Sequence, residues 1–301
     1  MSYPAALPPP ALVLGFDDYA APGERLAAAL KVPYARVAVH RFPDGESRVA
    51  LPLPLPARVA LCRSLDCPND KLVESILAAE TAREHGVRDL TLVAPYLCYM
   101  RQDTAFAPGE AVSQRIVGRL LAERFDAVVT VDPHLHRVAT LSEAVPAKAA
   151  VALSAASLFG GFLRERAPGA LLLGPDEESA QWLAAAAHGD AFETAVCRKA
   201  RRGDRDVAIE LPPVDLVRRE VVLVDDMAST GTTLAVAARL CLERGAASVD
   251  ALVVHGLFVG DALANLRRAG VRHVWSTDSV QHETNALPLA PLIARAFAAP
   301  P

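Results

Sequence analysis

Residues 221–234 constrain the fold of this chain more than any other stretch. They read Val-Val-Leu-Val-Asp-Asp-Met-Ala-Ser-Thr-Gly-Thr-Thr-Leu. The run from Val221 to Val224 is typical of a buried parallel strand. After the turn, residues 234–244 have the apolar periodicity of an amphipathic helix, which Gly245 is placed to end. A strand that passes directly into a helix in this way predicts an α/β fold.

The turn between this strand and this helix is suited to bind an anion. Backbone N–H groups converge at a helix N-terminus, and the helix dipole favours a phosphate there. Asp225 and Asp226 stand where they could hold ribose hydroxyls or a magnesium ion. The alternative is an ordinary strand-to-helix turn in which the two acids act only as a cap.

Size and composition narrow the class of protein. A chain of 301 residues, 52% of them hydrophobic, can bury a sizeable core in each of two domains. The net charge of −4 argues against non-specific nucleic-acid binding. Five cysteines without a CxxC spacing indicate reduced thiols. No signal-peptide pattern or membrane-length apolar run is evident, so we expect a soluble, cytoplasmic protein that binds no membrane.

Apolar periodicity and turn residues predict the other elements of the chain. We expect strands over residues 11–15, 37–40, 57–62, 90–94, 127–131, 170–176, 206–211, 249–255 and 271–279. We expect helices over residues 23–30, 71–86, 108–121, 154–166, 179–187, 261–270 and 292–297, and a change of chain direction near residues 147–154.

Residues 221–234 resemble the ribose 5-phosphate-binding loop of the type I phosphoribosyltransferase fold. The resemblance rests on a hydrophobic strand, an Asp-Asp pair and a Thr-Gly-Thr turn; the family's second glycine is replaced by Thr232. It implies that ribose 5-phosphate is bound by Asp225, Asp226, Ser229, Thr230, Gly231, Thr232 and Thr233.

Two segments of the first half resemble the nucleotide-binding elements of ribose-phosphate pyrophosphokinases. In Phe42-Pro-Asp-Gly-Glu46, proline and glycine indicate a tight turn. The resemblance implies that this turn contacts the nucleotide base of a neighbouring subunit, with Phe42 stacking and with Asp44 and Glu46 accepting hydrogen bonds. Arg101-Gln102-Asp103 resembles the segment with which the same enzymes hold ATP, and these side chains suit phosphate and hydrogen-bond recognition.

Asp132-Pro-His-Leu-His136 follows a predicted strand and leaves two interpretations open. Histidines two residues apart can share a face of extended chain, so a zinc site is one alternative, although no set of further ligands has completing spacing. The segment also resembles the family's Asp-x-His element, which implies that His134 is a ligand of catalytic magnesium. The same resemblance implies that Asp176, at another strand end, is a magnesium ligand. His136 has no obvious role, and we interpret it as structural. Glu177 and Glu178 depart from the small residues usual in the family, and we interpret them as helix-end charges.

Residues 195–205 form the one locally basic run of the chain. A charge run is usually a solvated face, and that interpretation stays open. The spacing of Lys199 and Arg201 resembles the family's catalytic loop, which implies that both side chains stabilise charge on the transferring group. A basic flap suits this chemistry, because pyrophosphoryl transfer concentrates negative charge in the transition state.

These motifs together identify the chain as resembling the ribose-phosphate pyrophosphokinases over nearly its whole length. The resemblance implies two phosphoribosyltransferase-like domains with central parallel sheets, related by a pseudo-twofold: residues 1–148 with the tail 286–301, and residues 149–285. It implies Mg²⁺-dependent pyrophosphoryl transfer from ATP to ribose 5-phosphate by a homo-oligomer whose nucleotide site is shared between subunits. A phosphoribosyltransferase that consumes the product and a non-catalytic regulatory relative remain alternatives.

Overall fold

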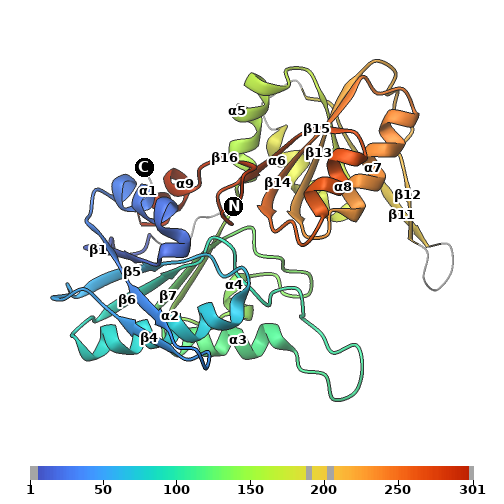
Figure 1. The fold of residues 1–301 in the computed structure, drawn as a ribbon. Helices are drawn as coiled ribbons and strands as arrows, with labels where there is room; N and C mark the ends of the chain where they lie inside the picture. The colour runs from blue at the N-terminus through green and yellow to red at the C-terminus, as the bar shows by residue number, and fades with distance from the viewer. Residues whose placement is uncertain (1–5, 188–191, 202–206, 298–301) are drawn as a thin grey trace. The chain divides into compact units, whose positions relative to one another are not determined.

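The structure is a computed structural model that describes residues 6–187, 192–201 and 207–297. The chain splits into two compact units, residues 1–153 with 288–301 and residues 154–287. Each unit is built on a six-stranded sheet in which every pairing is parallel (Figure 1). Within the described ranges, no helix has the length and hydropathy needed to cross a lipid bilayer.

The first unit has the sheet order β2-β1-β5-β6-β7-β8. Its strands are β1 (Leu12–Gly15), β2 (Tyr34–Arg36), β5 (Arg58–Cys62), β6 (Asp89–Val93), β7 (Ala127–Val131) and β8 (Ala149–Leu153). Its helices are α1 (Ala20–Leu30), α2 (Pro68–Glu84), α3 (Ser113–Ala122), α4 (Leu141–Ala144) and α9 (Ala290–Ala294), with 3₁₀ turns η1 (Asp17–Tyr19) and η3 (Arg295–Phe297). A separate antiparallel hairpin pairs β3 (Ala38–Arg41) with β4 (Ser47–Ala50).

The second unit repeats the same strand pattern as β10-β9-β13-β14-β15-β16. Its strands are β9 (Leu171–Gly174), β10 (Thr194–Val196), β13 (Glu220–Ala228), β14 (Ser248–Gly256), β15 (Val271–Thr277) and β16 (Asn285–Leu287). Its helices are α5 (Ala156–Arg166), α6 (Ala180–Ala186), α7 (Thr232–Glu243) and α8 (Ala262–Arg268), with the 3₁₀ turn η2 (Glu177–Ser179). A second hairpin pairs β11 (Arg198–Arg201) with β12 (Val207–Glu210).

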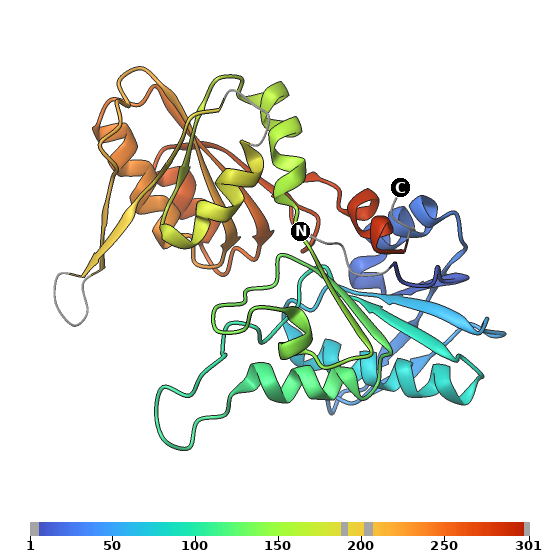
Figure 2. The ribbon, with the colours of Figure 1, turned by 180° about the vertical axis from the view of Figure 1, so that it is seen from behind.

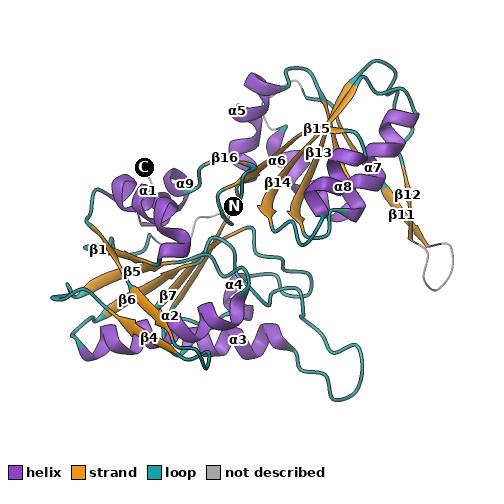
Figure 3. Cartoon of the chain, viewed as in Figure 1, coloured by secondary structure: helices purple, strands orange, loops and turns teal. Residues whose placement is uncertain are grey.

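Helices cover both faces of each sheet, as Figures 2 and 3 show. In the first unit α2 and α3 lie on one face, while α1 and α9 lie on the other (Figure 1). This arrangement explains why the central strands are apolar throughout: every residue of β7 and β9 is buried. The predicted fold class, an α/β architecture with two helix-flanked parallel sheets, is confirmed. The pseudo-twofold stays a prediction.

Three of the differences between the predicted and the observed elements have a clear physical reason. Helix α3 begins at Ser113 instead of residue 108, because Gly109 has a φ of +88° and the Glu110 carboxylate accepts from the amides of Phe106 and Ala107. Residues 149–153, where we expected only a change of direction, form the edge strand β8. Strand β13 runs past Val224 to Ala228, because β14 supplies backbone partners along that length.

Candidate active site

In the second unit the polar ends of two neighbouring strands meet. Strand β9 pairs with β13 in a register that aligns Leu171 with Val221. Asp176, two residues beyond β9, and Asp225 and Asp226 in the last part of β13 therefore come to the same carboxyl edge of the sheet. Asp176 and Asp226 are buried, with 8% and 6% of their surfaces exposed. The structure thus brings three of the predicted site carboxylates together, as open α/β sheets generally do at this edge.

Negative charge is concentrated in this acidic cluster, Asp176, Asp225 and Asp226. Burial and the negative charges of Asp226 and Asp176 raise the pKa of Asp225 well above its ordinary value. One Asp225 oxygen accepts a hydrogen bond of 3.0 Å from the Asp226 amide, which counteracts only part of this rise. Carboxylate oxygens are the ligands that Mg²⁺ prefers, so the donor set fits this ion.

Asp176 is held in place by the chain that follows it. Its side chain accepts a hydrogen bond of 3.1 Å from the Glu178 amide and so caps the 3₁₀ turn η2. Its carbonyl oxygen accepts a hydrogen bond from the buried Ser179 hydroxyl. Glu177 and Glu178 are exposed in the first turn after the strand, where acidic residues suit a helix N-terminus.

The turn after β13 presents a helix N-terminus beside the acidic cluster. Gly231 caps helix α7 with a φ of +70°, and a Cβ there would lie 3.4 Å from the Ala262 carbonyl oxygen. The positive φ favours glycine at this position, whereas the 3.4 Å separation is an ordinary van der Waals contact that a Cβ could make. Thr232, the first residue of α7, is not among the residues with positive φ, so the backbone accommodates threonine where the family's usual turn has glycine.

Hydrogen bonds from the neighbouring loop fix the start of this turn. The Ala228 carbonyl accepts from the amides of Leu257 and Phe258, both at 3.0 Å, and the Ser229 carbonyl accepts from Val259 at 2.9 Å. The hydroxyls of Thr230 and Thr232 lie 3.1 Å apart within hydrogen-bonding distance. Residues 229–233 therefore form a hydroxyl-bearing loop at the positive end of a helix, which is suited to a phosphate group.

Strand β11 carries the basic residues that we expected in a flap. The backbone of Lys199 pairs with Ile209, and that of Arg201 pairs with Val207, so both residues belong to the hairpin β11–β12. Figure 1 shows this hairpin extending from the sheet of the second unit. The side chains of Lys199 and Arg201 lie outside the described part of the structure, as do residues 202–206, which include Arg202 and Arg205. Their roles stay predictions.

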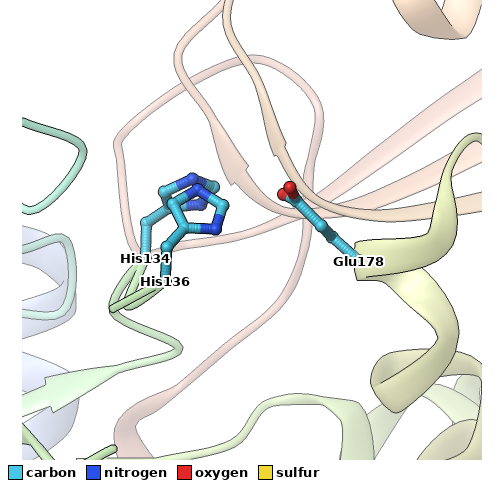
Figure 4. Close-up of side chains that lie close together, drawn as sticks. All are labelled: His134, His136 and Glu178. Carbon is cyan, nitrogen blue, oxygen red and sulfur yellow. The ribbon is translucent and has the colours of Figure 1, made fainter. Parts of the chain in front are cut away.

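In the first unit the predicted metal ligand His134 lies in the loop after β7. The loop begins at Asp132, which is buried and has a φ of +37°, an uncommon conformation for a residue other than glycine. His134 and His136 pack with their ring centroids 4.1 Å apart in an edge-to-face arrangement (Figure 4). The prediction that His134 and Asp176 hold the same metal ion joins residues of two units and stays a prediction.

The Arg101–Asp103 segment is linked to this histidine loop within the same unit. The Asp103 side chain is 2% exposed, and its Oδ1 accepts a 2.7 Å hydrogen bond from Nη1 of Arg137, the residue after His136. The Gln102 side chain accepts from the Ser113 hydroxyl at 2.6 Å, and Arg101 is exposed. Sequence analysis did not identify Arg137; the only signal in the sequence is a cation that directly follows the histidine motif.

The turn at residues 42–46 is exposed at the tip of the β3–β4 hairpin. Phe42 is 40% exposed, and its ring packs edge-on against His40 with centroids 4.8 Å apart. Gly45 has a φ of +95°, as the Pro-Asp-Gly pattern predicts. One Asp44 oxygen accepts from the Glu46 amide at 3.1 Å. An exposed aromatic ring with two carboxylates is suited to contact a planar, amine-bearing group.

Comparison with known proteins agrees with this geometry. Residues 14–124 match the model of the N-terminal domain of ribose phosphate pyrophosphokinase, and residues 197–292 match that of the phosphoribosyl synthetase-associated domain. A ribose-phosphate pyrophosphokinase of Methanopyrus kandleri is 36% identical over 95% of this chain and 98% of its own length. One of Halobacterium salinarum is 33% identical over 90% of this chain and 95% of its own.

A solved structure supports the fold. The phosphoribosylpyrophosphate synthetase of Mycobacterium smegmatis superimposes with a TM-score of 0.80 at 23% identity, covering 95% of this chain and 97% of its own. The likeness extends over both units. Together with the identity to the archaeal proteins over almost their full length, it shows that this chain belongs to the ribose-phosphate pyrophosphokinase family of enzymes.

Proposed function

We propose that this enzyme transfers the pyrophosphoryl group of ATP to the C1 hydroxyl of ribose 5-phosphate, giving phosphoribosyl pyrophosphate and AMP for nucleotide biosynthesis. The observation that carries the proposal is the acidic cluster, Asp176, Asp225 and Asp226, beside the loop 229–233 at one edge of a parallel sheet. A sugar phosphate needs both features, since the loop suits its phosphate and the carboxylates suit its hydroxyls. Family membership adds the pyrophosphokinase chemistry to this sugar-phosphate site.

The reaction is a displacement at phosphorus. The anomeric oxygen of ribose 5-phosphate attacks the β-phosphorus of ATP, the bond between this phosphorus and the bridging oxygen to the α-phosphate breaks, and AMP leaves with the electron pair. The proton of the anomeric hydroxyl is released to water. Because the bond changes are few, positioning of the two substrates and neutralisation of charge supply most of the catalysis.

Each predicted residue has a role in this scheme. Backbone amides and hydroxyls of residues 229–233 bind the 5-phosphate, and Asp225 and Asp226 hold the ribose hydroxyls or a second metal ion. Arg101, Gln102 and Asp103 bind ATP, and the turn 42–46 of a neighbouring subunit holds its base. Lys199 and Arg201 stabilise charge on the transferring group and on AMP.

His134 and Asp176 would hold Mg²⁺. When bound, the ion would neutralise charge on the triphosphate. We infer that the enzyme acts in the cytoplasm as a homo-oligomer, since the proposed nucleotide site takes residues from two subunits.

One incubation tests the proposal against its nearest alternative. The protein is given ATP, Mg²⁺ and ribose 5-phosphate, with no nucleobase, and AMP and phosphoribosyl pyrophosphate are followed by phosphorus NMR. We expect both products in equal amounts, and no turnover in the presence of EDTA until Mg²⁺ is added in excess. A phosphoribosyltransferase or a non-catalytic relative would form neither product, and that result would refute the proposal.

The role of the basic strand is tested by Lys199→Ala. We expect turnover to fall by roughly a hundredfold or more, because a cation aimed at developing charge is lost, while ribose 5-phosphate binding by calorimetry stays nearly unchanged. Arg198→Ala is the matched control, since Arg198 is an exposed cation one position away on the same strand. Full activity of Lys199→Ala would remove β11 from the mechanism.

A further inference from the structure

Glu74 is a carboxylate buried inside the first unit. It lies in helix α2, and its side chain is 1% exposed. Removing a carboxylate from water is unfavourable unless cations and hydrogen-bond donors surround it. The groups that surround Glu74 come from two places, the end of strand β5 and the β3–β4 hairpin.

One Glu74 oxygen is paired with a buried arginine. Oε2 accepts a 2.6 Å hydrogen bond from Nη2 of Arg63, whose side chain is 4% exposed just after β5. Arg63 is itself fixed: its Nε donates to both Asp18 oxygens at 3.1 Å, and its guanidinium lies 3.9 Å from the centroid of the Phe16 ring. The Arg63–Glu74 pair is therefore a buried, well-fixed ion pair to which the hairpin can attach.

The other Glu74 oxygen holds the hairpin. Oε1 accepts hydrogen bonds from the Ser47 hydroxyl at 2.9 Å and from Nε of Arg41 at 3.2 Å. Arg41 and Ser47 are Cα partners, the last pair of the ladder before the turn of residues 42–46. One buried carboxylate thus accepts hydrogen bonds from both strands of the hairpin at the base of the turn.

Two kinds of contact orient the hairpin: Val39 and Val49 pack against the apolar core of the unit, and Glu74 holds the end next to the turn. Strands β3 and β4 form a sheet of their own and pair with no strand of the six-stranded sheet in the described chain. A two-stranded hairpin without contacts to the rest of the protein is only marginally stable in water. The turn is closed internally, by the Phe42 amide donating to the Glu46 carbonyl at 2.8 Å, but this bond does not orient it relative to the unit.

We propose that Glu74 is a positioning residue that, through Arg41 and Ser47, fixes the direction in which the turn of Phe42, Asp44 and Glu46 is presented to the nucleotide base. This inference rests on the proposed nucleotide role of that turn. A buried ion pair is weak evidence for a stabilising role, because apolar residues of similar volume can be as stable. The geometry indicates that Glu74 orients the turn, since it bonds to the strand pair Arg41–Ser47, which is directly next to the proposed binding residues.

The double variant Arg41→Ala/Ser47→Ala tests the proposal. It releases the end of the hairpin next to the turn and also removes the 3.1 Å ion pair of Arg41 with Asp70. It leaves the Glu74–Arg63 pair and the core packing of Val39 and Val49 intact, so the fold should persist. We expect the KM for ATP to rise on the order of tenfold, as the loss of two modest hydrogen bonds and one exposed ion pair permits. The KM for ribose 5-phosphate should not change, and amide hydrogen exchange in residues 42–46 should accelerate. Arg48→Ala is the control, because Arg48 neighbours Ser47 but is exposed on the alternate side of β4.

Two further variants make the outcome decisive. Glu74→Gln keeps the shape of the side chain but removes its charge, and it should change the KM for ATP in the same direction. The melting temperature should also fall, because buried Arg63 keeps Asp18 but loses one of its two carboxylate partners. Phe42→Ala removes the proposed base contact itself. If Phe42→Ala raises the KM for ATP and the double variant does not, the positioning role is wrong. If Phe42→Ala leaves that KM unchanged, the nucleotide role of the turn is wrong, and the positioning proposal is refuted with it.

Discussion

Asp126 provides a prediction whose magnitude follows from the structure. Its side chain is 16% exposed before β7, at the amino edge of the first unit's sheet. Burial alone would raise its pKa, but hydrogen bonds from Lys148 at 2.6 Å, from the Leu90 amide at 2.9 Å and from Arg83 at 2.6 Å outweigh burial. The net result lowers the pKa of Asp126 from 3.8 to about 2.

The lowered pKa of Asp126 means that its ionised form stabilises the folded state. Each pKa unit corresponds to about 1.4 kcal/mol, so a carboxylate shifted from 3.8 to about 2 contributes about 2 kcal/mol to folding. We discount this value to about 1–2 kcal/mol, because the Lys148 side chain is 82% exposed and its charge is screened by water. Since the folded-state pKa is the lower one, the contribution is fully present above pH 4 and is lost as the pH falls through 2.

Asp126→Asn should therefore lower the free energy of unfolding by about 1–2 kcal/mol at pH 7, and the difference from wild type should shrink below pH 4. Urea unfolding at pH 7, 3.5 and 2.5 measures it. Glu123→Gln is the control, because Glu123 is a 64% exposed carboxylate paired with Arg124 and should change stability little at any of these pH values. Turnover should not change, since Asp126 lies at the edge of the sheet opposite to the histidine loop.

A difference between Asp126→Asn and wild type that stayed constant from pH 7 to pH 2.5 would refute the linkage argument. It would mean that packing or the geometry of the hydrogen bonds, and not the charge of Asp126, supplies the stability. A loss of turnover in a fully folded Asp126→Asn protein would refute the view that only residues at the carboxyl ends of the sheet strands take part in the reaction.

Two further predictions concern the proposed site. Asp225→Asn should raise the melting temperature of the metal-free enzyme at pH 8 and much less at pH 4, because the raised pKa of Asp225 means that its charged form destabilises the folded state above the pKa of the unfolded chain. Turnover should be lost, and an unchanged melting temperature at pH 8 would contradict the electrostatic interpretation. Arg137→Ala should raise the Mg²⁺ concentration needed for half-maximal rate several-fold, because it leaves buried Asp103 unpaired and loosens the His134 loop. Arg124→Ala is the control and should not change it; equal Mg²⁺ requirements for the two variants would show that the Arg137–Asp103 ion pair does not hold the loop.

The sequence was sufficient to predict those parts of the fold that depend on local pattern. Apolar runs located the central strands such as β7 and β13, and the Asp-Asp and Thr-Gly-Thr residues located the turn before α7. It was not sufficient where a partner distant in sequence decides the structure. The extension of β13 to Ala228 depends on β14, and the edge strand β8 depends on pairing with β7. Neither partner can be inferred from the apolar pattern of the strand itself.

The same limit applies to the candidate site. The grouping of Asp176 with Asp225 and Asp226 could be expected, because all three follow apolar runs and such strand ends share an edge. The partner of Asp103, by contrast, is Arg137, 34 residues away, and the partners of Glu74 come from two other elements. A charged residue inside a helix pattern gives no indication of which distant cation neutralises it, so the anchor of the β3–β4 hairpin could be found only in the structure.

The two shifted aspartates show how charge is distributed over these sheets. At the amino edge of the first sheet, Asp126 is satisfied by two cations and an amide, and its pKa is lowered. At the carboxyl edge of the second sheet, Asp225 faces two other carboxylates, and its pKa is raised. A carboxylate of the first kind stabilises the fold, whereas one of the second kind destabilises it until a cation or a hydroxyl-bearing ligand binds. Such an unfavourable arrangement is expected at a binding site, where residues are retained because they bind the ligand although they lower the stability of the fold.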